Sequence, residues 1–313
     1  WYGDRFAMPT EKRFKEQLQN GRMIEDESEM TDGYKKALKG TLLVSADTEL
    51  MSAPAYYEQS MNAPTLDSRA SCVSVIQDEL GHGHIAYRLL EDLGEDREEL
   101  LYEREPYEFR NTYGFDQPLE TFAELVCSHG MFDRAGMVLL SDIEEHTSYA
   151  PWKRALRKVG KEEQFHLRHG ETWMRRLTNK SEKTKQHVQD AVDWMFPMGV
   201  EWFGLPDDKK RNSDQLEYRI KGKTNDELRQ EWMSHVVPLA NDLDLEVPAH
   251  YDERADEFVL EYDAPVAFDA ENKDWRFEEP ISWDGVIDRW RDRGPANETH
   301  VDLIQSGTLE VGV

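Results

Sequence analysis

The sequence predicts an all-α protein whose centre is a four-helix bundle holding a pair of metal ions. The main observation is a Glu-x-x-His motif that occurs twice, at Glu79–His82 and Glu163–His166, where chance predicts about one. Each motif places a carboxylate and an imidazole on one side of a helix, one turn apart. Each lies in a long segment with helical spacing of apolar residues and follows another such segment that carries a Glu. Four such helices can enclose two metal ions.

The composition of the chain restricts its class. The 313 residues can bury a sizeable core, and 64 acidic against 38 basic residues give a net charge of -26. This excess is spread along the chain and argues against binding to nucleic acid or to an anionic membrane. Because such charges repel one another unless salt screens them, we expect a halophilic source. Unchanged stability between low and molar KCl would count against that expectation.

The cysteines and the hydropathy pattern bear on the compartment. Cys72 and Cys127 have no paired spacing, which is typical of a reduced protein with buried thiols. No stretch of the sequence reaches the length of a transmembrane helix. We therefore expect a cytoplasmic protein.

Two apolar stripes predict the first half of the bundle. The first helix is expected from about 34 to 51, with Pro54 ending it, and the second over roughly 66–93, with Gly94 as its stop. The first stripe contains Leu38, Leu42, Ala46, Glu49 and Ala53; the second contains Cys72, Val75, Ile76, Glu79, His82, Ala86, Leu89 and Leu90. A link with a short helix near 96–104 follows and suits a crossover between the two halves.

The second half repeats this order. Pro118 opens a third long helix, and a fourth begins near Pro151. Their stripes contain Thr121, Glu124, Ser128, Met131, Ala135 and Leu139, and then Leu156, Val159, Glu163, His166, Gly170, Trp173 and Leu177. Further helices are expected at about 183–200 and 225–241.

The character of the chain changes after Pro248. We expect a helical metal-binding domain over residues 1–244 and a small mixed extension over residues 245–313. In the extension, residues 258–262 have the pattern of a strand, and residues 275–277 are the candidate partner. A last helix is expected near 283–291, followed by an acidic tail.

The stripes supply six candidate metal ligands, which are also the candidate catalytic residues. They are Glu49, Glu79, His82, Glu124, Glu163 and His166. Taken singly, each Glu can be a solvated helix residue and each His an ordinary core or surface residue. Four carboxylates buried in apolar stripes, however, need a shared compensation, which two divalent cations supply. Carboxylate oxygen and imidazole nitrogen suit iron or manganese. Glu79 and Glu163 are expected to bridge the ions, with Glu49 and Glu124 as terminal ligands.

Residues around the motifs leave alternatives open. Asp78 and Glu162 precede the bridging residues, and each can accept a hydrogen bond from a ligand imidazole, as can Asp142 on a neighbouring helix. His84 is expected to be exposed. His169 can support the ligands, although exposure is the expected outcome.

Three stretches of the sequence resemble a known family. They are Ile76–Gly83, Lys161–His166 and Thr224–Gln230, and the last carries no metal ligand. They are similar to the catalytic A subunit of bacterial ring-1,2-phenylacetyl-CoA epoxidase, as is the segment Tyr149–Trp152. The resemblance covers roughly residues 30–245.

The resemblance implies a ferritin-like bundle, a di-iron centre and a multi-subunit monooxygenase of phenylacetate catabolism that epoxidises the ring of phenylacetyl-CoA with O2. The ligands of that family fall on the proposed positions, with one departure. The third helix there carries Asp, whereas Glu124 is assigned here and Glu120 is a minor competitor. The chain has no Gly-rich dinucleotide loop and no iron–sulfur cysteine set. A separate NAD(P)H-dependent flavin and iron–sulfur reductase is therefore implied, as is a ferritin-like structural subunit without metal ligands.

Other residues are candidates for binding the substrate. Coenzyme A carries phosphates, and the dense basic clusters that follow the bundle can bind it, can bind a partner, or can be a solvated loop. These clusters contain Lys209, Lys210, Arg211, Lys221 and Lys223. The aromatic residues Trp194, Phe196, Trp202 and Phe203 can line a substrate cavity, although such spacing is more often core. The alternative functions are a related benzoyl-CoA epoxidase, a ferritin-like ferroxidase and a scaffold subunit.

Overall fold

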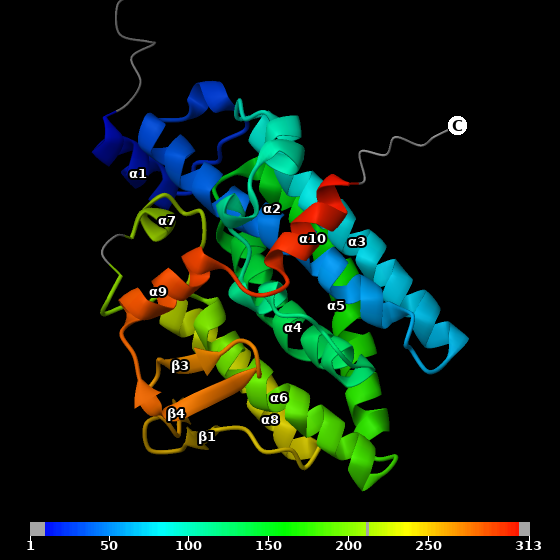
Figure 1. Ribbon diagram of the computed structural model, residues 1–313. Helices are drawn as coiled ribbons and strands as arrows, with labels where there is room; N and C mark the ends of the chain where they lie inside the picture. The colour runs from blue at the N-terminus through cyan, green and yellow to red at the C-terminus, as the bar shows by residue number, and fades with distance from the viewer. Residues whose placement is uncertain (1–9, 211–212, 307–313) are drawn as a thin grey trace, which may run out of the picture.

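Four long helices form the central bundle of the protein. The computed structural model describes residues 10–210 and 213–306. The bundle consists of α2 (Asp32–Ser60), α3 (Leu66–Glu91), α4 (Phe122–His146) and α5 (Ala150–Thr178), each of which crosses most of the molecule (Figure 1). The pairs α2/α3 and α4/α5 are each joined by a short connection, so their members are antiparallel neighbours. The predicted ferritin-like all-α architecture is confirmed.

Threonine and serine side chains define where most of the helices begin. Thr31, Thr65 and Thr121 each accept a hydrogen bond from a backbone N–H of the first turn, at α2, α3 and α4 respectively. Ser181 and Thr224 do the same for α6 (Glu182–Trp202) and α8 (Asn225–Asp242). Such caps satisfy backbone donors that have no partner inside the helix.

The prediction that Pro54 ends the first long helix is wrong. Helix α2 continues through Pro54 to Ser60, and every residue from 50 to 56 is buried. Proline removes one backbone donor from a helix interior. Here the apolar side chains on both sides of it are packed in the core, and this packing keeps the segment helical.

The two helices of the α4/α5 pair approach one another closely at a glycine. A Cβ atom on Gly170 of α5 would lie 2.7 Å from the backbone nitrogen of Gly130 and 2.8 Å from the oxygen of Val126 on α4. No larger residue fits there without moving a helix. Glycine at this position therefore sets the separation of α4 and α5, and with it the width of the bundle interior.

The link between the two halves is held by a buried ion pair. It contains a π-helical turn (Glu99–Glu103) and two 3-10 turns (Pro106–Glu108 and Tyr113–Asp116). The Arg104 guanidinium donates to both carboxylate oxygens of Asp47 in α2, at 2.6 and 2.9 Å, and Asp47 is fully buried. The crossover is thereby attached to α2 two residues before Glu49.

Further helices pack on the second half of the bundle. Helix α6 lies along α4 and α5, and α8 packs on α4, where the indole N–H of Trp232 donates to the backbone oxygen of Met131 at 2.8 Å. The short helices α1 (Glu11–Gln19) and α7 (Asp214–Glu217) lie near one end of the bundle (Figure 1). These additions bury α4 on several sides, and every residue from 123 to 133 is buried.

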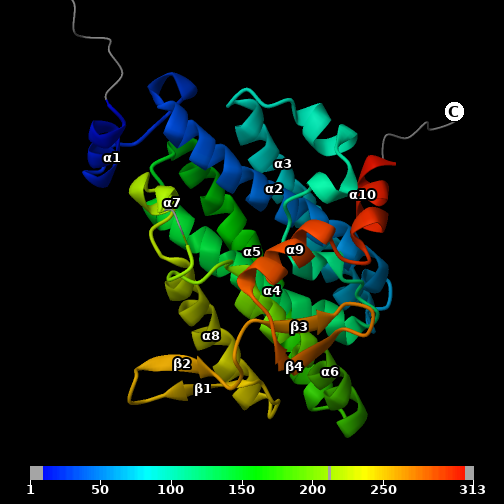
Figure 2. The same ribbon diagram turned by 60° about the vertical axis from the view of Figure 1, so that its left-hand side comes forward.

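The C-terminal residues form two separate hairpins and two helices. Strand β1 (Ala249–Asp252) pairs with β2 (Glu257–Leu260), and β3 (Val266–Asp269) pairs with β4 (Asp274–Pro280), both antiparallel (Figure 2). The predicted pairing of residues 258–262 with 275–277 is therefore wrong. Phe258 pairs with Tyr251, and Trp275 with Phe268, because a tight turn brings each strand to its nearest neighbour in sequence.

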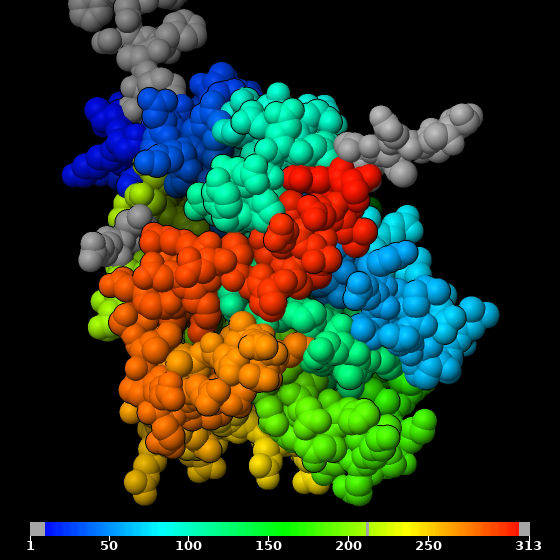
Figure 3. Space-filling model, in the orientation of Figure 1, coloured from blue at the N-terminus to red at the C-terminus, as the bar shows by residue number. Residues whose placement is uncertain are grey.

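The extension covers one face of the bundle. Helix α9 (Trp283–Asp292) was expected, whereas α10 (Asn297–Gln305) replaces part of the expected acidic tail. Figure 3 shows these orange and red residues spread over the face toward the viewer, beside the turquoise crossover. The Arg293 guanidinium lies 2.7 Å from a carboxylate oxygen of the buried Asp116 and fastens the extension to the crossover. No helix among the described residues is long and apolar enough to cross a membrane.

Candidate dinuclear metal centre

Six acidic and imidazole side chains from the four bundle helices converge in the interior. They form two overlapping sets, and in each set one potential ligand atom per residue lies within 4.8 Å of all the others. The first set is Glu49, Glu79, His82 and Glu163; the second is Glu79, Asp133, Glu163 and His166. Glu79 and Glu163 belong to both, which is the arrangement expected of residues that bridge two neighbouring positions.

Short contacts between the helices hold Nδ1 of His82 and Nδ1 of His166 close to the carboxylates of the cluster. Nδ1 of His82 lies 3.3 Å from a carboxylate oxygen of Glu49 and 3.2 Å from one of Glu163. Nδ1 of His166 lies 3.1 Å from Oε1 of Glu79. The hydroxyl of Ser52 on α2 donates to the other oxygen of Glu79 at 2.8 Å. One nitrogen of each imidazole is therefore turned toward the shared carboxylates.

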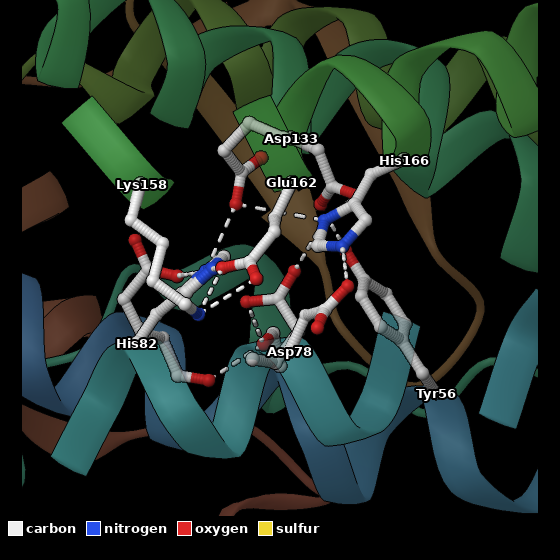
Figure 4. Close-up of polar contacts among 11 residues, drawn as sticks. Tyr56, Asp78, His82, Asp133, Lys158, Glu162 and His166 are labelled. Atoms are coloured by element: carbon white, nitrogen blue, oxygen red, sulfur yellow. Dashed lines mark hydrogen bonds and ion pairs between the residues drawn. The ribbon is translucent and has the colours of Figure 1, made fainter. Parts of the chain in front are cut away.

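The outer nitrogen of each imidazole meets a carboxylate from the opposite helix (Figure 4). Nε2 of His82 on α3 lies 3.1 Å from Glu162 on α5, and Nε2 of His166 on α5 lies 3.4 Å from Asp78 on α3. Of the three candidates for this role, Asp78 and Glu162 therefore contact the rings. Asp142 instead accepts the backbone N–H of Gly222 at 2.8 Å. The crossed contacts fix the orientation and tautomer of both imidazoles.

The structure does not place Glu124 with the other predicted ligands. Glu124 lies in the first turn of α4, where it forms a reciprocal capping box with Thr121. One of its oxygens accepts hydrogen bonds from the indole N–H of Trp194 at 3.0 Å and from the ammonium of Lys273 at 2.7 Å. The competitor Glu120 is also bound by Lys273, at 3.0 Å. Both carboxylates are thus partnered away from the cluster, and this part of the prediction is corrected.

Asp133 supplies the α4 carboxylate of the cluster, the role that was predicted for Glu124. It lies on α4 two and a half turns beyond Glu124, and its side chain is 3% exposed. Two signals in the sequence could have identified it. Asp133 precedes Glu163 by thirty residues, as Glu49 precedes Glu79 by thirty. Thr121 and Glu124 also have the spacing of a capping box, which explains the glutamate without a metal.

The electrostatics of the cluster follow from burying four carboxylates together. Burial, reinforced by Glu163, raises the pKa of Glu79 well above its usual range and that of Asp133 to about 8. Burial lowers the pKa of an imidazole, but the facing carboxylates outweigh it and raise the pKa of His82 to about 11 and that of His166 to about 12. Despite its burial, Glu163 has a pKa lowered to about 2 by these imidazoles. Protons thus balance the negative charge when cations do not.

The chemistry of the residues fits a pair of divalent transition-metal ions. Each set offers three carboxylates and one imidazole, a donor set that suits iron or manganese. Oδ2 of Asp133 and Nδ1 of His166 are buried, make no hydrogen bond with the described residues, and lie 3.9 Å apart. Two ligand atoms that are each about 2 Å from one ion lie at most about 4 Å apart. The two atoms are therefore close enough to share one ion.

A second layer of buried polar groups surrounds the Asp133 side of the cluster. The phenol of Tyr56 donates to Asp133 and accepts a hydrogen bond from Ser128 at 3.1 Å. His169 is buried, contrary to the expected exposure, and its Nδ1 lies 3.1 Å from that of His129. Burial lowers the pKa of both rings, that of His169 to about 4, so this pair is neutral at physiological pH. His84 is exposed as expected.

A small recess and a larger cavity adjoin the cluster on its α2/α4 side. A recess of about 20 Å³ is bounded by cluster carboxylates and by the rings of Phe115, Phe132 and Trp202. It shares Glu49, Gly136 and Trp202 with a cavity of about 370 Å³ between α2, α4 and the segment after α6. A second cavity of about 600 Å³, beside Arg110, Arg291 and Arg293, shares Trp202 and Phe203 with the first. Glu49 and its neighbours are therefore reached from a cavity of substrate size.

The predicted basic and aromatic residues divide into two groups. Lys210 and Lys221 line the 370 Å³ cavity, whereas Lys209 and Lys223 pair with Asp208 and Glu231, at 3.3 and 2.6 Å. Arg211 lies outside the described residues. Among the aromatic candidates, Trp202 and Phe203 line both cavities. Trp194 donates to Glu124, and Phe196 packs on Trp232 with ring centroids 5.3 Å apart. The last two are core residues.

This arrangement defines a class of protein. A bundle whose helices direct carboxylates and imidazoles to two adjoining positions is the ferritin-like scaffold used for pairs of metal ions. Comparison with known proteins agrees with it. Residues 11–272 match the family described as phenylacetic acid catabolic protein, and the chain belongs to that family, as its sequence motifs predicted.

Two relatives from Escherichia coli (strain K12) are similar to this chain. The first is the A subunit of 1,2-phenylacetyl-CoA epoxidase, with 31% identity over 296 residues, which cover 94% of this chain and 91% of the relative. The second is the C subunit of the same enzyme, with 26% identity over 194 residues, which cover 60% of this chain and 74% of the relative.

Proposed function

We propose that this chain is the catalytic oxygenase subunit of an enzyme that epoxidises the aromatic ring of phenylacetyl-CoA with O2. The observation that carries the proposal is the pair of ligand sets that share Glu79 and Glu163 at the inner end of an apolar cavity. The similarity to the A subunit of the epoxidase over nearly the whole chain supports the same activity and substrate. The complete ligand set argues against a role as scaffold alone.

Two iron ions would be held by six side chains. Glu49 and His82 would hold one ion, Asp133 and His166 the other, and Glu79 and Glu163 would bridge them. When bound, the ions supply the reduction of O2 that the reaction requires. The chain's own residues fix the positions of the ions, since the crossed contacts of Asp78 and Glu162 orient the imidazoles.

The recess beside Glu49 has room only for a group of about the size of water or O2, so the reacting ring would lie in the adjoining 370 Å³ cavity. Trp202 lines both spaces, so a ring at their boundary would contact apolar surface on one side. The rings of Phe115, Phe132 and Trp202 also exclude water, which protects reactive species from side reactions. The proposed passage runs past Gly136 from the recess into the larger cavity, which also suits the linear part of a thioester substrate.

Lys210 and Lys221 are suited to the phosphates of coenzyme A. Both line the larger cavity, and both donate to Asn225, at 3.4 and 2.7 Å, rather than to a carboxylate. Burial, followed by the neighbouring Lys210, lowers the pKa of Lys221 to about 8, and burial lowers that of Lys210. Two partly desolvated cations that form no ion pair within the described part of the chain favour an anionic ligand.

The activity also requires other proteins. Similarity to both the A and the C subunits of one enzyme supports assembly into a multi-subunit complex. We propose a ferritin-like partner subunit without metal ligands, and electrons from NAD(P)H through a separate flavin and iron–sulfur reductase. We also propose that the complex works in the cytoplasm.

Metal analysis combined with turnover tests this function. Chain loaded anaerobically with Fe2+ is expected to bind two ions. With a chemical reductant, labelled O2 and phenylacetyl-CoA, one labelled oxygen atom is expected in the product. Product from benzoyl-CoA alone would identify the related aryl-CoA epoxidase instead. Iron oxidation without any dependence on a thioester, in a closed shell of identical chains, would identify a ferroxidase.

A substitution at Gly136 tests the proposed passage. A Cβ atom at Gly136 would meet no atom within 4 Å, and this residue lines both the recess and the larger cavity. We expect Gly136→Leu to bind two iron ions but to lose most thioester turnover. Gly160→Leu is the matched control on α5, where the nearest atom to a new Cβ is a Glu144 oxygen at 3.9 Å. Equal turnover by the two variants would contradict this route.

A further inference from the structure

The outward face of α5 is strongly basic in a protein that is otherwise acidic. Nine residues of α5 are exposed; seven of them are Lys or Arg, and none is acidic. They are Arg154, Arg157, Lys158, Lys161, Gln164, Phe165, Arg168, Arg175 and Arg176. Since acidic residues outnumber basic ones by 64 to 38 in the whole sequence, this concentration of positive charge is local. We call the central part of it, Arg157 to Arg168, the basic face.

The charges of the basic face are largely uncompensated. Arg157, Lys161 and Arg168 make no ion pair with the described residues, whereas Arg154 pairs with Glu25 and Arg175 with Asp242. Residues 157, 161, 164 and 168 are spaced four, three and four apart and therefore form one row along the helix. Such a row raises the local potential and attracts an acidic surface.

The basic face is also where the metal cluster comes closest to solvent on this side of the bundle. Glu162, whose side chain is 25% exposed, contacts Nε2 of His82 on its inner side and the ammonium of Lys158 on its outer side (Figure 4). Phe165, which is 38% exposed, has its ring centroid 6.3 Å from that of the buried His166. On this face Glu162 therefore contacts both the surface and His82, whereas the outer nitrogen of His166 contacts the partly exposed Asp78 of α3 at 3.4 Å.

The substrate cavities do not use this face. The two cavities of about 370 and 600 Å³ are lined by residues of α2, α4, α6, α7, α8, α9 and the connecting segments, and none of their described lining residues belongs to α3 or α5. A protein bound to the basic face would therefore leave the substrate route open. Electrons and substrate can then reach the cluster at the same time, from different sides.

We propose that the basic face is the docking site of an acidic electron-transfer protein with a [2Fe–2S] cluster. This inference rests on the proposed function, because ring epoxidation consumes electrons. One O2, two electrons and two protons convert the arene to an epoxide and release one water. The two electrons come from the [2Fe–2S] protein, one at a time. The rate of electron tunnelling falls steeply with distance. An electron donor is therefore favoured to dock on the face where the imidazoles lie closest to the surface. The exposed Phe165 lies among the Lys and Arg residues of the basic face. Such an apolar centre within a charged rim is typical of transient interfaces.

Binding of an acidic plant-type [2Fe–2S] ferredoxin tests the proposal without requiring turnover. We expect the charge reversals Arg157→Glu, Lys161→Glu and Arg168→Glu, combined in one variant, to raise the Kd for ferredoxin about tenfold or more at low ionic strength. Carbodiimide cross-linking of the unaltered chain should join ferredoxin carboxylates to Lys158 and Lys161. The matched control reverses Lys12, Arg13 and Lys36, which are exposed and unpaired among the described residues.

Four results would overturn the docking site. The first two are equal weakening of ferredoxin binding by the two triple variants and no binding by the unaltered chain. The others are cross-links that map to the faces of α1 or α2, and a basic face that is covered by a second copy or by a partner subunit. Thioester oxidation driven by dithionite separates this failure from failure of the proposed function. It should be unchanged in both triple variants if the function is correct, and absent from all proteins if it is not.

Discussion

The two halves of the bundle are built alike but surround their metal positions differently. In each half, a carboxylate precedes a Glu-x-x-His motif by thirty residues, at Glu49 in α2 and at Asp133 in α4. Glu49 has a side chain that is 12% exposed and lines the 370 Å³ cavity. Asp133 is 3% exposed and accepts a hydrogen bond from the phenol of Tyr56. The halves thus share a ligand pattern but not an environment.

This difference implies unequal roles for the two metal positions. The ion position that we propose at Glu49 and His82 adjoins the 370 Å³ cavity, so a ligand exchanged during the reaction would reach it. The position that we propose at Asp133 and His166 is surrounded by Tyr56, Ser128 and the neutral pair His129 and His169. A longer, partly exposed carboxylate can rearrange, whereas a short, buried and hydrogen-bonded one is held in place.

Removing either shared carboxylate should have the largest effect. In Glu79→Ala or Glu163→Ala both metal positions lose a ligand, so we expect nearly complete loss of iron and of turnover with most helix content retained. Iron per chain and circular dichroism measure the two effects. Two irons per chain in either variant would show that the residue does not bridge.

The corrected ligand of the second half can be tested against the residue that it replaces. Asp133→Ala should reduce iron from about two ions per chain to about one or fewer, because the second position keeps only His166 and the bridges. Glu124→Ala should keep both ions and instead lose about 1–2 kcal/mol of stability, since the capping box and the contacts of Trp194 and Lys273 disappear. The reverse outcome would restore Glu124 as the ligand.

Metal binding should be strongly dependent on pH. The raised pKa values of Asp133, His82 and His166 mean that ions must displace protons from these groups near neutral pH. In the metal-free protein, the stability contributed by the protonated imidazoles is complete below pH 6.5 and declines toward their folded-state pKa values. Between pH 6 and 8, iron affinity should therefore rise while metal-free stability falls. The gap in Tm between loaded and metal-free protein measures both, and a gap that narrows with pH would contradict the assignment.

Removing the hydroxyl of Tyr56, which is found only beside the second metal position, is expected to have the smallest effect on iron binding. Tyr56→Phe removes the hydrogen bond to Asp133, and we expect iron affinity at one position to fall about tenfold, with two ions still bound at saturating iron. Tyr87→Phe is the matched control, since Tyr87 is an equally buried phenol that donates to Asp47 outside the cluster. Both should lose about 1–3 kcal/mol of stability. A titration that shows the same iron affinity in both variants would mean that Tyr56 does not support the ligand.

Sequence patterns predicted the structure correctly where a local pattern determines it. The Glu-x-x-His motifs fix residue type and direction together, and the long stripes predicted α3, α5, α6, α8 and α9 to within a few residues. The prediction failed at Glu124 because α4 is buried on nearly every side, so its apolar stripe does not indicate which face points to the cluster. Helix α10 is short and mostly polar, and it is held by Asn297 and His300, which contact Asp116 and the backbone oxygen of Phe115 at 3.1 and 3.0 Å; no local pattern records these distant contacts.

The crossed pairing of Asp78 with His166 and of Glu162 with His82 makes the two motif helices interdependent. Each imidazole is steadied by a chain segment other than its own, so neither motif is a self-contained unit. If one such helix were transplanted into another scaffold, the imidazole of its motif would be free to rotate. A sliding of α3 against α5 would disturb both positions together, which ties the integrity of the centre to the register of these two helices.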